Sequence, residues 1–166
     1  RIILIPFFVF FLLNGNMWVA APLFIIASLT DFLDGFLARK YNLVTNFGKL
    51  MDPLADKLLV TSALIGFVEL GRLSSWVVII ILSREFIVSI FRAIAASEGV
   101  VIAASWWGKS KTISQMVMVI LLLINNIPFE WVNFPMDTVF IYIATVLTII
   151  SGADYIIKNK SVLSKG

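Results

Sequence analysis

Four carboxylates lie close together in a chain that is otherwise strongly apolar. They are Asp31, Asp34, Asp52 and Asp56. The first two are spaced i, i+3 and the last two i, i+4, so each pair shares one face of a helix. Grouped carboxylate oxygens are the ligands that hard divalent cations such as Mg²⁺ or Mn²⁺ prefer. Because four such charges repel one another, we expect these aspartates to hold metal ions.

Structural roles explain some of these acids when each is taken singly. Asp52 directly precedes Pro53, and Asp at the N-cap followed by Pro is a common start of a helix. Asp34 and Asp56 each have a basic residue nearby and can be read as ordinary interfacial charge. Capping accounts for one of the four at most, and it does not explain Asp31 or Asp34 within an apolar run.

Small residues accompany the aspartates at helical spacing. Gly35 and Ala38 follow the first pair, and Gly48 precedes the second pair. Small side chains let either a second helix or a flat ligand approach the backbone closely, and both interpretations use the same space. Arg39 follows one turn after Gly35, where its guanidinium is suited to binding a phosphate.

The composition is that of an integral membrane protein. Of the 166 residues, 60% are hydrophobic and 14% are charged, whereas soluble domains carry about 25% charged residues. The chain contains no Cys and no His. Disulfides, thiol nucleophiles and phosphohistidine intermediates are therefore excluded, and proton transfer falls to carboxylates, Lys, Tyr or water.

Six apolar segments predict an all-α membrane protein with six transmembrane helices in a single domain, residues 1–166. The segments are Ile2–Leu13, Trp18–Leu37, Pro53–Leu70, Ser75–Ala96, Ser110–Ile124 and Thr138–Ile157. A helix needs about 20 residues to cross the hydrocarbon core. The first segment is shorter than that, so we expect it to be truncated at its N-terminus.

Basic residues are divided unequally between the two sides that six spans imply. Most Lys and Arg residues fall on the side of both termini, and Arg72 falls on the opposite side. Positive charge in short loops marks the cytoplasmic face. Both termini and the aspartates are therefore predicted to lie toward the cytoplasm of a cell membrane, and Lys158, Lys160 and Lys165 are read as positive-inside charge.

Four further basic residues belong to the fourth and fifth segments or their ends: Arg84, Arg92, Lys109 and Lys111. Arg84 and Arg92 are flanked by apolar residues, so positive-inside charge explains them poorly. Arg84 is expected to lie deeper, and the other three at a cytoplasmic rim. A basic pocket beside a metal centre suits an alcohol that bears phosphate, such as glycerol 3-phosphate. Glu85 is read as the partner of a basic neighbour, and Asp154 as a partner of Lys57 or of an arginine.

Eight positions around the aspartates form one extended motif. The motif reads D-x-x-D-G-x-x-A-R, eight residues, G, three residues, D, three residues, D, and its fixed positions are Asp31, Asp34, Gly35, Ala38, Arg39, Gly48, Asp52 and Asp56. It resembles the signature of the CDP-alcohol phosphatidyltransferase family, and all eight positions match. The stretches "NLVTNFGKLMDPLADKLLV", "SREFIVSIFR", "WGKSKT" and "SGADY" are similar to the bacterial phosphatidylglycerophosphate synthases within that family.

The resemblance implies a fold, a reaction and a set of site residues. Members are six-helix membrane enzymes, usually homodimers, that transfer a phosphatidyl group from CDP-diacylglycerol to an alcohol and release CMP. It implies a centre of two divalent cations held by Asp31, Asp34 and Asp52, which Asp56 joins and where it acts as the base. It implies that the CDP moiety is bound by Asp31, Asp34, Gly35, Ala38, Arg39, Gly48 and Asp52. The implied acceptor is glycerol 3-phosphate, and we expect the basic residues Arg84, Arg92, Lys109 and Lys111 to bind its phosphate.

Two other functions are compatible with parts of this pattern. One is the same reaction with another acceptor, namely inositol phosphate, serine or phosphatidylglycerol. The other is a divalent-cation transporter, which needs polar residues that continue toward the far side of the membrane. The second and third segments offer few of these: Ser28, Thr30, Thr61 and Ser62. No nucleic-acid partner is expected.

Overall fold

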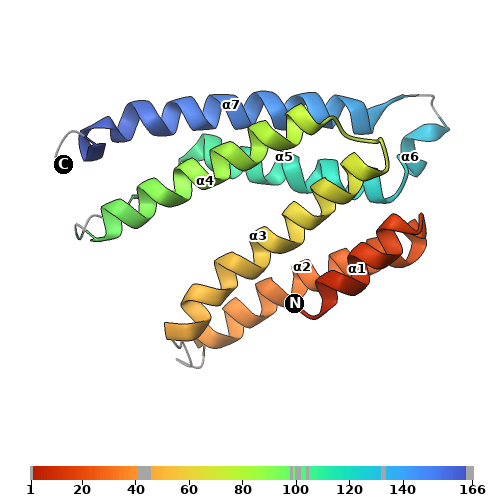
Figure 1. Cartoon of the computed structure of the whole chain (residues 1–166), viewed down its shortest axis with the longest axis horizontal. Helices are drawn as coiled ribbons and strands as arrows, with labels where there is room; N and C mark the ends of the chain where they lie inside the picture. Colours follow the sequence, from red (N-terminus) through yellow and green to blue (C-terminus); the bar gives the residue numbers. More distant parts are fainter. Residues whose placement is uncertain are drawn as a thin grey trace. The chain divides into compact units, whose positions relative to one another are not determined.

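A computed structural model describes the backbone of residues 2–40, 46–97, 99, 102–103, 105–131 and 134–163. Side chains are described for the same residues except 31–40, 46–53, 128, 130 and 160–163. The helices within these ranges are α1 (Leu4–Leu13), α2 (Met17–Lys40), α3 (Asn46–Glu69), α4 (Ser75–Ser97), α5 (Trp106–Leu123), α6 (Ile127–Glu130) and α7 (Met136–Leu163) (Figure 1). The prediction of an all-α fold is confirmed.

The helix boundaries differ from the predicted segments where charged residues occur. Helix α2 continues past Leu37 to Lys40, and α3 begins at Asn46 instead of Pro53. The added residues include good helix formers, Arg39 and Lys40 in α2 and Lys49, Leu50 and Met51 in α3, so each helix extends beyond the apolar run that predicted it. Asp52 and Pro53 therefore both lie inside α3, and the interpretation of Asp52 as an N-cap is wrong. The short helix α6 was not predicted.

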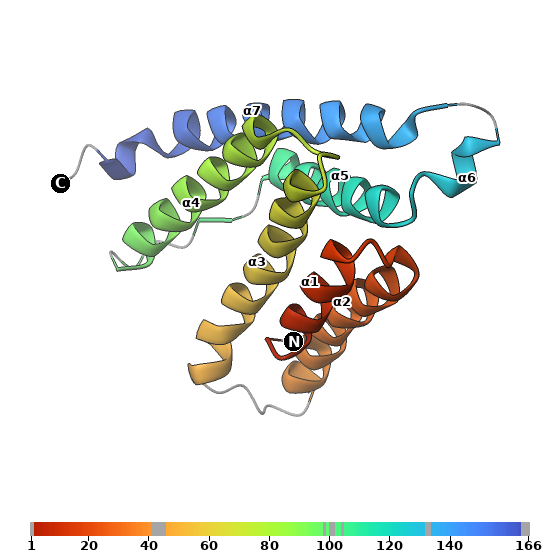
Figure 2. The same ribbon diagram turned by 45° about the vertical axis from the view of Figure 1, so that its right-hand side comes forward.

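The helices belong to two compact units, and the first unit contains the aspartates. It comprises Arg1–Leu73 and Leu123–Asn125, and within it α1, α2 and α3 pack against one another. The buried rings of Phe8 and Phe24 join α1 to α2, with centroids 5.5 Å apart. The last turns of α2 and the first turns of α3 lie at the same end of this unit (Figure 2). The packing therefore keeps the two aspartate-bearing segments together.

Close packing of α1 against α3 depends on a glycine. A Cβ added to Gly66 of α3 would lie 2.5 Å from Cδ2 of Leu12, a buried residue of α1. Such a separation is far below van der Waals contact, so a larger side chain at Gly66 would force the buried side chain of Leu12 to move. Gly66 thus leaves the space that Leu12 occupies between α1 and α3.

The second unit comprises Ser74–Leu122 and Asn126–Gly166. Its main contact is between α4 and α7, and its core includes Val88, Phe91 and Tyr155, against which Ile102 packs. The rings of Phe91 and Tyr155 meet edge to face with centroids 6.0 Å apart, which is a favourable aromatic geometry. This unit carries the basic residues predicted to bind an acceptor.

Membrane character is visible only in part of the described chain. Met136–Asn159 is the one described helix that is long and apolar enough to cross a membrane, while Leu4–Leu13 and Met17–Thr30 are shorter apolar helices. The other long helices are interrupted by charge: α3 carries Asp52 and Asp56, and α4 carries Arg84.

Candidate active site

The first group of site residues lies at the C-terminal end of α2. Asp31, Asp34, Gly35 and Ala38 are all within its helical backbone, at positions i, i+3, i+4 and i+7. In an α-helix these positions share one face. The structure thus provides the helical register that the motif requires, although these side chains and that of Arg39 lie outside the described part.

The second group lies at the N-terminal end of α3. Gly48, Asp52 and Asp56 are spaced i, i+4 and i+8 on one helix and again share a face. The side chain of Asp56 is described and is exposed, whereas Ala55 and Leu59 beside it are buried. The carboxylate of Asp56 is therefore accessible to solvent.

Carboxylates from two packed helices are a chemically suitable donor set for divalent cations. The donors are all oxygens, as Mg²⁺ and Mn²⁺ prefer, and α2 packs against α3 in the same unit. Among the residues with described side chains, no group of three or more potential ligands is gathered at one point. Three of the four predicted ligands, Asp31, Asp34 and Asp52, fall outside that set.

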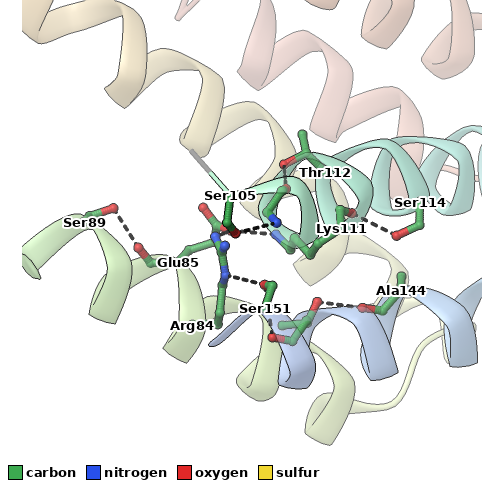
Figure 3. Close-up of polar contacts among 11 residues, drawn as sticks. Arg84, Glu85, Ser89, Ser105, Lys111, Thr112, Ser114, Ala144 and Ser151 are labelled. Carbon is green, nitrogen blue, oxygen red and sulfur yellow. Dashed lines mark hydrogen bonds and ion pairs between the residues drawn. The ribbon is translucent and has the colours of Figure 1, made fainter. Parts of the chain in front are cut away.

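The second unit contains a polar cluster built from three helices (Figure 3). Arg84 on α4 donates from Nε to Oγ of Ser151 on α7 at 2.9 Å, and from Nη1 to Oε1 of Glu85 at 3.0 Å. Lys111 on α5 donates from Nζ to the same Oε1 at 2.6 Å. The side chains of Arg84, Glu85 and Lys111 are 11%, 27% and 2% exposed. The interpretation of Glu85 as the partner of a basic neighbour is confirmed.

Lys109 and Lys111 lie on different faces of α5. Lys109 is exposed, as expected for a rim, whereas Lys111 is buried against Glu85. Residues two apart on an α-helix point in nearly opposite directions, because each residue turns the helix by about 100°. The expected position of Lys111 at an exposed rim is therefore wrong.

Two other charged residues singled out from the sequence, Arg92 and Asp154, make contacts outside the polar cluster of Arg84, Glu85 and Lys111. Arg92 is exposed, with Cζ 5.9 Å from the centre of the Tyr155 ring, which is within the range of a cation–π contact. Asp154 pairs with Lys158, four residues further along α7, at 2.7 Å. That partner was not among those considered from the sequence, although the i, i+4 spacing was a signal for it.

Sequence reasoning missed the residues that enclose Arg84. Ser151 accepts a hydrogen bond from its guanidinium, and two glycines let neighbouring helices approach it. A Cβ on Gly108 would lie 3.3 Å from Nη2 of Arg84, and a Cβ on Gly152 would lie 3.3 Å from its Cγ. Small residues at these points were the available signal, but nothing in the sequence indicated which side chain they accommodate.

Comparison with known proteins shows to which family the chain belongs. A family model described as CDP-alcohol phosphatidyltransferase matches residues 1–150. The chain belongs to the CDP-alcohol phosphatidyltransferase family. It is similar to the CDP-diacylglycerol–glycerol-3-phosphate 3-phosphatidyltransferase of Bacillus subtilis. The two are 46% identical over an alignment of 174 positions, which covers 96% of this chain and 90% of the relative. The enzyme of the same name from Haemophilus influenzae is 40% identical and covers 94% and 86%.

A third relative has a related name. It is a probable phosphatidylglycerophosphate synthase of Mycobacterium tuberculosis, 40% identical over 162 residues that cover 94% of this chain and 76% of the relative. The resemblance to the CDP-alcohol phosphatidyltransferases drawn from eight motif positions is therefore confirmed. The chain is a transferase of this family, and the roles of its individual residues stay predictions.

Proposed function

We propose that this CDP-alcohol phosphatidyltransferase transfers the phosphatidyl group of CDP-diacylglycerol to sn-glycerol 3-phosphate, giving phosphatidylglycerophosphate and CMP. The observation that carries the proposal is the similarity to relatives named for this reaction, which extends over more than nine-tenths of the chain. Specificity of a transferase depends on the whole site, so similarity over the full length supports a shared acceptor better than the family motif alone.

The donor site is proposed to lie on α2 and α3. In this proposal Asp31, Asp34, Asp52 and Asp56 hold two divalent cations, Mg²⁺ or Mn²⁺. The support is that these residues belong to the last turns of α2 and the first turns of α3, which lie at one end of the first unit. When bound, such cations neutralise the pyrophosphate of the donor. Gly35 and Ala38 leave room for the CDP moiety, Gly48 for a close backbone approach, and Arg39 binds a phosphate.

The chemical step needs a proton acceptor beside the attacking hydroxyl. Asp56 takes that proton while the hydroxyl oxygen forms a bond to the phosphorus on the lipid side of the pyrophosphate. The bond from this phosphorus to the CMP oxygen breaks, and CMP leaves with the electron pair. General-base help of this kind is worth about 10²–10⁴-fold in rate.

The acceptor phosphate is proposed to bind on the second unit, at the basic residues of α4 and α5. Arg84 offers a guanidinium held by Ser151 and Glu85, and Arg92 and Lys109 offer exposed positive charge. Charged hydrogen bonds of this type are about twice as strong as neutral ones. Lys111 was predicted to join them, but its side chain is buried against Glu85.

We further propose that the six helices α1 to α5 and α7 form one membrane-embedded catalytic domain, residues 1–166, with the termini and the site toward the cytoplasm. Large apolar side chains at the surface support a lipid environment, among them Trp18 and Trp131, which are 81% and 93% exposed. The family match crosses both units, which supports one domain. A homodimer is proposed by analogy with the family.

The proposed function is tested by measuring CMP release from purified protein with CDP-diacylglycerol and Mg²⁺ or Mn²⁺. We expect release with glycerol 3-phosphate as the acceptor and little with serine, inositol phosphate or phosphatidylglycerol. Turnover of one of those alcohols in place of glycerol 3-phosphate would contradict the proposed acceptor but not the reaction class.

Neutral variants of the exposed cations should affect the acceptor selectively. Arg92→Gln and Lys109→Gln should each raise the KM for glycerol 3-phosphate about tenfold, because each removes charged hydrogen bonds worth about 1.5–3 kcal/mol. The KM for CDP-diacylglycerol should stay the same. Lys160→Gln, which removes a positive charge read as topological, is the control. Equal shifts in both KM values would indicate a general distortion instead of acceptor binding.

A further inference from the structure

The guanidinium of Arg84 is held in one orientation from two sides. Nε is bonded to Ser151 of α7, and Nη1 is bonded to Glu85 of α4, the next residue along the chain. A planar guanidinium fixed at two of its nitrogens keeps its other N–H groups pointing in a defined direction. Those groups remain for a planar or tetrahedral anion such as a phosphate.

Lys111 supports this arrangement from the third helix. Its ammonium group lies 2.6 Å from Oε1 of Glu85, the same oxygen that accepts from Arg84. The side chain of Lys111 is only 2% exposed, compared with 27% for Glu85. A phosphate arriving from outside would meet Glu85 and Arg84 before it could reach this amine. Lys111 is therefore placed to act on Glu85, and not on a substrate.

Close packing limits sideways movement of Arg84. The missing side chains of Gly108 and Gly152 leave space that Arg84 occupies, since a Cβ at either position would lie 3.3 Å from one of its atoms. Figure 3 shows Arg84 between Glu85 and Ser151, with Lys111 approaching from the α5 side. The charged groups that meet at Oε1 of Glu85 are thus the guanidinium of Arg84 and the ammonium of Lys111.

We propose that Glu85 and Lys111 are positioning residues that orient Arg84 toward the acceptor phosphate, and that Lys111 does not bind the phosphate itself. The inference rests on the proposed function and assigns to Lys111 a role different from the one predicted from the sequence. Glu85 holds the guanidinium through Oε1, and Lys111 in turn fixes Glu85 through the same oxygen. Loss of either member releases the same restraint on Arg84.

A double-mutant cycle on kinetic constants tests this order of contacts. Glu85→Gln and Lys111→Met should each raise the KM for glycerol 3-phosphate about tenfold and leave the KM for CDP-diacylglycerol unchanged. The double variant should show no larger increase than the greater of the two single effects, because both changes break one chain of contacts. Multiplication of the two effects would show that Lys111 acts independently of Glu85, and would overturn the proposal.

A second pair of variants avoids leaving a buried charge without a partner. Ser151→Ala removes one hydrogen bond to Arg84 and no charge, and should raise the KM for glycerol 3-phosphate about threefold. Ser114→Ala is the matched control, because Ser114 is a buried serine of α5 that bonds the backbone oxygen of Lys111. If Ser151→Ala behaves like Ser114→Ala at equal thermal stability, the orientation of Arg84 does not matter and the proposal fails.

The wild-type protein separates this inference from the proposed function. A wild type that releases no CMP with glycerol 3-phosphate would overturn the proposed acceptor. Normal wild-type turnover together with multiplying effects in the cycle would overturn only the positioning roles of Glu85 and Lys111.

Discussion

Replacing Asp31, Asp34 or Asp52 by asparagine should abolish CMP release, with a loss in kcat of about 10³-fold or more. Asparagine keeps the shape of the side chain and one oxygen, but it removes the negative charge that a divalent cation requires. The three positions lie on helices that pack in one unit. Loss of any one should therefore weaken the whole donor set, while the helices keep their fold.

Chelation of metal provides the complementary measurement. Addition of EDTA to the wild type should stop CMP release, and excess Mg²⁺ or Mn²⁺ should restore it. Asp137→Asn is the control variant, because Asp137 lies in the first turn of α7, where its carboxylate accepts a hydrogen bond from the backbone N–H of Thr138. Full activity of the wild type in EDTA would contradict the proposed metal centre.

The fold was predictable from the sequence as a series of helices, but the ends of those helices were not. Long apolar runs identified each long helix in its correct order, because burial in lipid or in a core needs continuous apolar surface. The same signal placed the start of the third segment at Pro53, whereas α3 begins at Asn46. Polar residues extend a helix without extending its apolar run, so hydropathy alone misplaced the very turns that carry Asp52.

The candidate site was predictable where its residues lie on one helix and unpredictable where they come from several. The spacing of the aspartates is a local property, and helical backbone at those positions was the expected consequence. The bond from Arg84 to Ser151 joins residues 67 positions apart, and that from Lys111 to Glu85 joins residues 26 apart. No periodicity within a single segment encodes which residues of α5 and α7 meet α4, so these partners required the structure.

Asp56→Asn should lower kcat by about 10²–10⁴-fold, the usual contribution of a general base. Asp56 is the candidate because it is the last carboxylate of the motif along α3 and its side chain is exposed beside the buried Ala55 and Leu59. Binding of CDP-diacylglycerol should remain, because the residues assigned to the nucleotide are unchanged. The measurement is kcat from CMP release at saturating concentrations of both substrates.

Saturating metal distinguishes a base from a residue that only holds a cation. If Asp56 acts as the base, the low kcat of Asp56→Asn persists however much Mg²⁺ or Mn²⁺ is added. An acceptor analogue whose attacking hydroxyl is made more acidic by a neighbouring fluorine should then lose less activity, because it depends less on a base. Glu69→Gln is the matched control, since Glu69 is an exposed acid about 20 Å further along the same helix. Recovery of the wild-type kcat at high metal concentration would instead limit Asp56 to binding the cation, and the proton would have to leave by way of another group.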